Sequence, residues 1–181
     1  MGTIIFGMLT SLDGYITGLE GGPELPVPEA PLHRYFNRLM QDTRISVCGR
    51  KLYQAMRYWD TDQADWPEEG REFATAWQAT PKFVCSTTLR EVGPNATLIN
   101  EDVVGTLKRL KARTDGMIDV GGAELAASLD GLDLIDEYHL YVNPVVLGGG
   151  KPFFAGKTPK LRFVGQQILP QDVVLMRYAA V

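Results

Sequence analysis

Cysteines and histidines are scarce in this sequence, and no apolar run is long enough to cross a membrane. The 181 residues include two cysteines, Cys48 and Cys85, and two histidines. Each cysteine lies in a short apolar run, so we expect both to be small buried strand residues in a reducing compartment. No apolar stretch approaches the roughly 18 residues of a membrane span. We therefore expect neither a metal site nor a membrane partner.

Basic residues are also in the minority, which bears on partners. The 18 Lys and Arg residues face 22 Asp and Glu residues, for a net charge of -4. Nucleic acids are bound by clustered Lys and Arg, so this balance argues against a nucleic-acid partner. The N-terminus shows no basic leader, and we expect a cytoplasmic protein. The length favours one domain over residues 1–181 with a core of its own.

The most informative stretch is a strand that stops at two glycines. Residues 118–120 are a short β-branched run, Gly121 and Gly122 follow, and residues 123–129 favour a helix. Such a corner lets backbone N–H groups approach an anion such as a pyrophosphate. Because the full G-x-G-x-x-G spacing is missing, a tight turn without any ligand is the competing interpretation.

The first strand leads into a polar loop. Residues 3–9 are almost continuously apolar, which predicts a central strand covered on both faces. Ser11 and Asp13 follow within the loop of residues 10–18. Ligands of open α/β sheets bind at the carboxyl ends of strands, so these two side chains are candidates to contact a polar heterocycle. Alternatively, they close an Asx-type turn.

Two further predicted strands end in candidate phosphate contacts: residues 45–48 lead to Gly49, Arg50 and Lys51, and residues 82–85 lead to Ser86 and Thr87. Cations at the start of a helix face the positive end of its dipole, which is unfavourable unless an anion is present. Solvated long side chains and a local Ser/Thr turn are the respective alternatives. Together with the glycine corner, these strand ends predict a dinucleotide site.

Other segments predict structure more than chemistry. Residues 19–32 are rich in Pro and Gly, which excludes regular structure and favours a lid or substrate flap rather than an idle connector. An amphipathic helix up to about Gln41 follows and carries His33, more simply a surface or satisfied residue than a proton donor. Residues 69–79 predict a helix with Phe73 and Trp77 facing inward. Residues 161–169 and 173–179 predict an antiparallel hairpin. His139 lies within another predicted strand and is most simply a packed or cross-strand residue.

Several of these motifs resemble one known family. Residues 10–16 resemble the S-L-D-G loop of the reductase domain of riboflavin biosynthesis (the RibD C-terminal type), within the dihydrofolate-reductase-like superfamily. Residues 49–53 resemble its G-R-x-T-Y element, and residues 81–89 resemble the P-K-x-V-x-S-x-T-L element of stand-alone members. Residues 134–140 with 143–150 are similar to its most specific signature. The resemblance spans nearly the whole chain, in order.

The resemblance implies a fold, a cofactor and a partner. The expected fold is α/β, with a mostly parallel sheet of eight or nine strands, helices on both faces and antiparallel strands at the C-terminus. NADPH is the implied cofactor, and homodimers are frequent. Two departures concern the substrate: Val120 stands where riboflavin-pathway members often carry Glu, and the start of the second helix offers Glu29 and Pro31 without a clear Asp. Leu52 also replaces the usual Thr.

The predicted function is therefore NADPH-dependent hydride transfer to a small heterocycle of the pyrimidine or pteridine type, as in 5-amino-6-(5-phosphoribosylamino)uracil reductase. Dihydrofolate reduction and a catalytically inactive nucleotide-binding sensor or scaffold are the alternatives. The expected contacts of the coenzyme are Ile16 and Gly18 for the nicotinamide amide, Gly49, Arg50, Lys51, Ser86 and Thr87 for phosphates, and Gly121, Gly122, Ala123 and Glu124 for the pyrophosphate. Ser11 and Asp13 are expected at the substrate, with Asp13 relaying a proton through water.

Overall fold

The computed structural model describes residues 1–21 and 24–181, so Gly22 and Pro23 of the predicted lid lie outside the described residues. In these ranges the chain forms, in order, β1 (Thr3–Thr10), β2 (Tyr15–Thr17), α1 (Ala30–Asp42), β3 (Thr43–Gly49), α2 (Arg50–Met56), the 3-10 helix η1 (Arg57–Asp60), α3 (Glu68–Ala79), β4 (Lys82–Cys85), β5 (Ala96–Ile99), α4 (Val103–Arg113), β6 (Met117–Gly121), α5 (Ala123–Leu129), β7 (Glu137–Val142), β8 (Lys151–Pro152), β9 (Leu161–Ile168), the 3-10 helix η2 (Pro170–Asp172) and β10 (Val174–Ala180). Within the same ranges, no helix is long and apolar enough to span a membrane.

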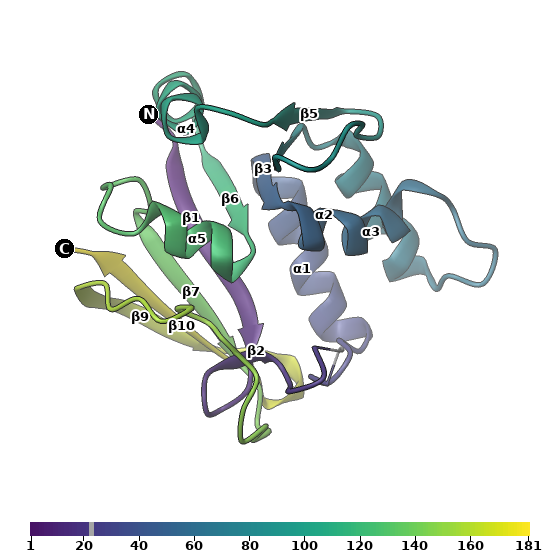
Figure 1. Ribbon diagram of the computed structural model, residues 1–181. Coiled ribbons are helices and arrows are strands. Elements are labelled where there is room, and N and C mark those ends of the chain that lie inside the picture. The colour runs from purple at the N-terminus through teal and green to yellow at the C-terminus, as the bar shows by residue number, and fades with distance from the viewer. Residues whose placement is uncertain (22–23) are drawn as a thin grey trace.

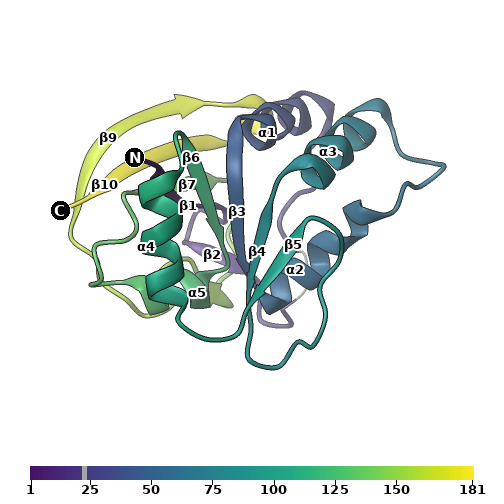
Figure 2. The same ribbon diagram turned by 90° about the horizontal axis from the view of Figure 1, so that it is seen from above.

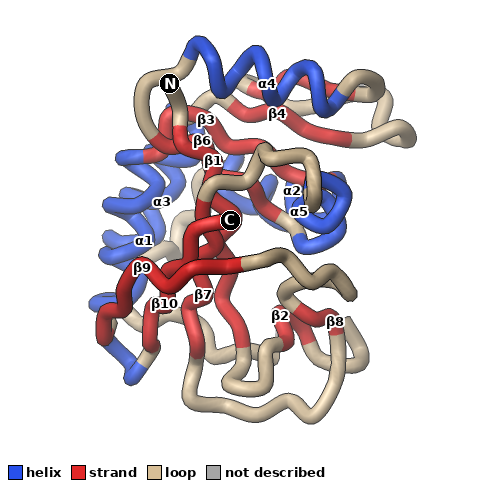
Figure 3. The backbone as a smooth tube through the Cα atoms, turned by 90° about the vertical axis from the view of Figure 1, so that its left-hand side faces the viewer, coloured by secondary structure: helices blue, strands red, loops and turns tan. Residues whose placement is uncertain are grey.

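One large sheet organises the molecule (Figure 1). It has eight strands in the order β5-β4-β3-β6-β1-β7-β10-β9. The pairs from β5 to β7 are parallel, whereas β10 is antiparallel to both β7 and β9. The mostly parallel sheet and the C-terminal hairpin are therefore confirmed. β2 and β8 form a separate antiparallel pair that the sequence pattern did not predict, at one end of the molecule (Figure 3).

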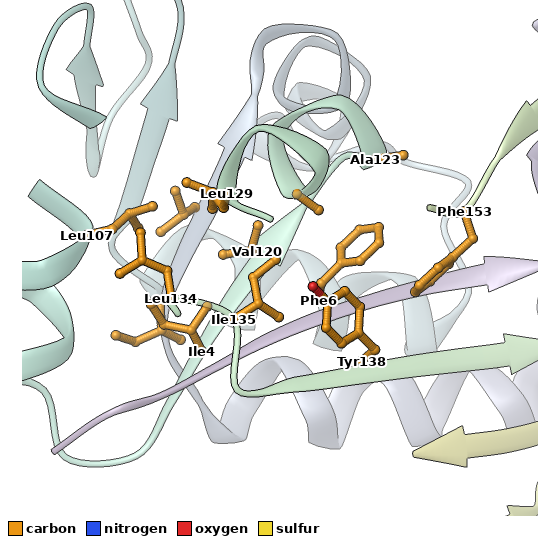
Figure 4. Close-up of a cluster of buried hydrophobic side chains, with 13 residues drawn as sticks. Ile4, Phe6, Leu107, Val120, Ala123, Leu129, Leu134, Ile135, Tyr138 and Phe153 are labelled. Atoms are coloured by element: carbon orange, nitrogen blue, oxygen red, sulfur yellow. The ribbon is translucent and has the colours of Figure 1, made fainter. Parts of the chain in front are cut away.

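Helices cover both faces of this sheet, as expected (Figure 2). The alternation of apolar residues decides which face each side chain meets. Ile4 and Phe6 of β1 join Leu107 of α4 and Leu129 of α5 in the larger core cluster (Figure 4). On the opposite face, Leu32 of α1 packs with residues of β7 and β10, and α1 and α3 lie against each other. β1 is thus the central, doubly covered strand that its apolar run predicted.

One helix begins earlier than expected. α1 starts at Ala30, inside the stretch of residues 19–32 that was predicted to lack regular structure, and residues 24–29 are irregular. Pro31 lies in the first turn of the helix, where a missing backbone N–H costs no hydrogen bond. A proline that we counted against regular structure in residues 19–32 therefore helps to start the helix.

The predicted packing of the aromatic and sulfur side chains is also observed. Trp77 is buried, its indole N–H donates to Asp60 Oδ1 at 2.8 Å, and Phe73 packs in the same cluster. Both cysteines are free; Cys48 is buried, Cys85 partly so. Burial raises the pKa of the Cys48 thiol to about 12 and that of the Cys85 thiol to about 11. Such thiols stay protonated at neutral pH.

Asp119 is a carboxylate inside the sheet. It lies on β6 between Ile5 of β1 and Ser46 of β3. The alternation of strand residues turns it away from the cluster that holds Ile118 and Val120. Burial raises the pKa of this carboxyl to about 7. The charge of Asp119, when it is ionised, also raises the pKa of Cys48 and that of Tyr141.

We expect the stability of the protein to fall as Asp119 loses its proton. The pKa of this carboxyl in the fold, about 7, lies above its ordinary value of 3.8. The folded state therefore holds a proton that the unfolded state has released, and stability decreases as pH rises through this window and levels off above it. Asp119→Asn should gain about 2 kcal/mol relative to wild type between pH 5 and pH 8 in urea unfolding. The exposed Asp115→Asn is the control, and an equal pH dependence of Asp119→Asn and wild type would contradict this assignment.

Candidate functional site

The structure gathers the predicted strand ends at one edge of the sheet. β4, β3, β6, β1 and β7 are consecutive neighbours and all parallel, so their carboxyl ends point the same way. Gly49 is in register with Cys85, and Cys48 is in register with Gly121. The loops that follow β4, β3 and β6 therefore start beside one another, whereas β1 and β7 continue together past that level to Thr10 and Val142. This edge is where ligands of open α/β sheets bind.

The corner between β6 and α5 requires glycine at Gly122, and at Gly121 it is close to the side chain of Leu52. Gly121 is buried, and a Cβ added there would lie 2.3 Å from Cδ2 of Leu52. Gly122 has a φ of 104°, which L side chains rarely adopt, and a Cβ there would face the backbone nitrogen of Gly49 at 3.9 Å. Ala123 then begins α5. The backbone of the corner after β6 thus lies close to the backbone of the corner after β3.

Charged side chains surround this corner. Arg50 and Lys51 form the first turn of α2, which contains no acidic residue, and both are exposed. Glu124 in the first turn of α5 accepts a hydrogen bond from Nζ of Lys151 at 2.5 Å. Lys151, the first residue of β8, was not among the residues singled out from the sequence. The only local signal for it is its place after the triple glycine of residues 148–150.

Ser86 and Thr87 follow β4 at the same edge, but Ser86 is engaged locally. Its Oγ accepts the backbone N–H groups of Thr88 at 3.2 Å and Leu89 at 3.0 Å. This is the Ser/Thr turn that the sequence left open as the alternative. Thr87 is exposed. The phosphate contact of these two residues stays a prediction.

Ser11 and Asp13 tie two loops together. Ser11 is fully buried, and its Oγ accepts the N–H of Tyr15 at 3.0 Å. Asp13 accepts the backbone N–H groups of Leu147 at 3.1 Å and Gly148 at 2.8 Å. A hydrogen bond from Ser11, and then those two N–H groups, lower the pKa of Asp13. Asp13 is therefore ionised at neutral pH and clasps the loop after β7 to the loop after β1.

The stretch from Ile16 to Gly18 lies beside the same loop. β2 pairs with β8, and Ile16 packs against the larger core cluster. Gly150 has a φ of 130°, and a Cβ there would lie 2.0 Å from the carbonyl oxygen of Thr17. At least this glycine of the triple is thus required by a close backbone approach. The nicotinamide contact of Ile16 and Gly18 stays a prediction.

The two histidines are satisfied inside the protein, as the sequence analysis favoured. Nδ1 of His33 lies 2.8 Å from Oδ1 of Asn37, and its ring stands edge-on to Trp59 and Phe73. His139 is buried in β7, where Nε2 lies 2.7 Å from Oε2 of Glu137. Burial lowers the pKa of His139, which keeps the imidazole neutral at pH 7.

Comparison with known proteins now decides the family. The profile of the RibD C-terminal domain matches residues 2–175. The chain belongs to the RibD C-terminal domain family. Among curated proteins it is similar to the uncharacterized protein YyaP of Bacillus subtilis, at 28% identity over 97% of this chain and 93% of YyaP. It is also 40% identical to the uncharacterized protein YwjB of the same organism, over 45% of this chain and 48% of YwjB.

Solved structures of RibD-like proteins share the fold. A proposed riboflavin biosynthesis protein of Shewanella sp. PV-4 superimposes with a TM-score of 0.74 at 25% identity, over 100% of this chain and 99% of that chain. A pyrimidine reductase-like protein of Corynebacterium diphtheriae gives 0.68 at 14% identity, over 99% and 92%. Acinetobacter baumannii RibD gives 0.73 at 14% identity, over 100% of this chain and 58% of RibD. This chain thus corresponds to just over half of that longer protein.

The departure at Val120 has a structural counterpart. Riboflavin-pathway members of the RibD C-terminal type often carry Glu before the two glycines. Here Val120 is fully buried in the larger core cluster with Phe6 and Leu129 (Figure 4). Its side chain is thus part of the packing under α5.

The clasp of Asp13 can be tested without any ligand. Asp13→Asn replaces one carboxylate oxygen by an amide that cannot accept an N–H, so one of the two loop amides loses its acceptor. We expect the amides of Leu147 and Gly148 to exchange with solvent at least about tenfold faster, while amides of the central strands keep their protection. Asp62→Asn, in an exposed loop, is the matched control. Unchanged exchange of both amides would show that Asp13 does not hold this loop.

Proposed function

We propose that this protein is an NADPH-dependent reductase that transfers a hydride to a small heterocycle of the pyrimidine or pteridine type. The observation that supports it most is the meeting of the β3, β6 and β1 corners at one edge, in a chain of the RibD C-terminal domain family. A similar fold occurs in a Thermotoga maritima protein named as a deaminase and 5-amino-6-(5-phosphoribosylamino)uracil reductase, with a TM-score of 0.70 at 15% identity over 99% of this chain and 57% of that one. Reduction of such a compound is the activity we favour.

The residues at this edge fit a dinucleotide coenzyme. Gly122 keeps the corner bare of side chains, and Arg50 and Lys51 place two cations next to it. Thr10 ends β1 with a fully buried hydroxyl, and its Oγ1 has no hydrogen-bond partner among the described residues. Buried polar atoms without a partner are uncommon and point to a missing ligand or water. We assign the phosphates to Arg50, Lys51 and the backbone of residues 121–123.

The protein's own part in the reaction is to position and to shield. Bound NADPH would supply the hydride, so the side chains need not carry out the redox chemistry. The loop clasped by Asp13 and the stretch of residues 24–29 are the segments we assign to excluding water. Asp13 remains our candidate for relaying a proton through water. Since its carboxylate is ionised at neutral pH, it accepts a proton before it can pass one on.

The proposal is tested by coenzyme binding followed by turnover. NADPH at about 100 times its dissociation constant should stabilise the protein by about 2.7 kcal/mol in thermal unfolding.

Arg50→Ala should weaken the binding of NADPH about ten- to a hundredfold, and that of NADH much less, if Arg50 contacts the additional phosphate of NADPH. Equal losses for both coenzymes would remove that role from Arg50.

Turnover separates the three candidate functions. Oxidation of NADPH is followed with 5-amino-6-(5-phosphoribosylamino)uracil and with dihydrofolate. Activity only with the first compound supports the proposal, and activity only with the second establishes a dihydrofolate reductase. NADPH binding without oxidation by any heterocycle tried supports a binding protein that has lost catalysis, and the absence of binding overturns the proposal.

We further propose that two copies of the chain associate through the strand at the sheet edge. β9 is the last strand of the sheet, and it exposes 53% of Phe163 and 79% of Ile168. An exposed apolar edge strand is a surface on which another chain can pair or pack.

A charge on this edge should separate the copies. Ile168→Glu places a carboxylate in the apolar surface, so light scattering coupled to size exclusion should change from twice the chain mass to the chain mass. Gln167→Glu, exposed on the opposite face of the same strand, is the control for charge alone. A wild-type protein of single chain mass would contradict the dimer.

A further inference from the structure

A carboxylate of the protein lies among the cations of the corner between β3 and β6. Nζ of Lys151 donates to Oε1 of Glu124 at 2.5 Å. The hydrogen bond and the charge of Lys151 are the main causes that lower the pKa of Glu124, and the charges of Lys51 and Arg50 lower it further. Glu124 is therefore ionised at neutral pH. One carboxylate thus offsets part of the charge of three cations.

This ion pair is not needed to hold the fold together. The Glu124 side chain is 67% exposed and that of Lys151 is 31% exposed. Exposed ion pairs contribute little to stability, because water screens them and two long side chains must be ordered. The connection between β8 and the rest of the chain is already fixed by its pairing with β2. Lys151 can therefore leave Glu124 at little cost to the stability of the fold.

We infer that Lys151 is a further phosphate-binding residue of this corner, and that Glu124 competes with phosphate for it. This inference rests on the proposed function and adds to it a resident competitor. An ammonium group has three N–H donors and no acceptor, so a phosphate oxygen can take the place of the Glu124 carboxylate on Lys151. While Glu124 stays close, its negative charge also repels a polyanion that approaches Arg50 and Lys51. Glu124 thereby sets how tightly the corner holds phosphate.

The competition is measured with two probes, inorganic pyrophosphate and NADPH. Glu124→Gln keeps the size of the side chain and removes its charge, so it should bind both probes about three- to tenfold more tightly at low salt, with a smaller gain at high salt. Lys151→Met should bind both probes more weakly than wild type. Glu68→Gln, which removes an exposed glutamate from the first turn of α3, should bind both like wild type. Dissociation constants come from NMR titration of the corner amides, whose spectra also show that each variant is folded.

Each result decides one of the two claims. Tighter pyrophosphate binding by Glu124→Gln, in a protein that does not bind NADPH, keeps the competition and removes the reductase proposal. Unchanged or weaker pyrophosphate binding by Glu124→Gln overturns the competition, whatever NADPH does. Unchanged binding of pyrophosphate by Lys151→Met removes Lys151 from the site. If wild type and all variants fail to bind either probe, both claims fall.

Discussion

The parallel backbone pairing of β3, β6 and β1 is the constraint on which the rest of this structure depends. β6 pairs with β3 on one side and with β1 on the other. Because all three strands run in the same direction, the chain must leave each of them at the same edge. Gly49, Gly121 and Thr10 are placed there by hydrogen bonds between main chains and not by side-chain contacts. The topology of the sheet therefore decides where the candidate site lies, and the side chains decide only what it can bind.

The short polar side chains of this edge are largely occupied within the protein. Ser86 closes its own turn, Ser11 holds Tyr15, and Asp13 holds the loop after β7. A hydroxyl or carboxylate used in this way stabilises a loop and is less available to a ligand. Long cations and bare backbone at the glycine corner remain to meet an anion. The groups of this edge that stay open to a ligand are therefore those suited to phosphate.

The sequence predicted what depends on neighbouring residues and missed what depends on distant ones. The apolar run of β1 and the strand-to-helix change at Gly121 are local patterns, and both were found. The pairing of β2 with β8 joins segments far apart in the chain and lacks a local pattern, so Lys151 was not predicted as a site residue. The raised pKa of Asp119 could not be predicted either, because β1 and β3, which flank this residue in the sheet, come from distant parts of the chain. The effect of Pro31 was predicted wrongly, because a proline disrupts the interior of a helix but is tolerated in its first turn.

The place of β6 also has a consequence for how the chain folds during its synthesis. β1 and β3 are never neighbours, since β6 separates them, and β6 begins only at Met117. A growing chain that has already formed β3, β4 and β5 therefore still shows two unpaired strand edges facing a gap. Such edges can associate with other unfinished chains, and long-range pairings close slowly. β3 and β1 can therefore be joined in one sheet only after β6 has been made, so the insertion that builds the ligand edge also delays the joining of the two halves of the sheet.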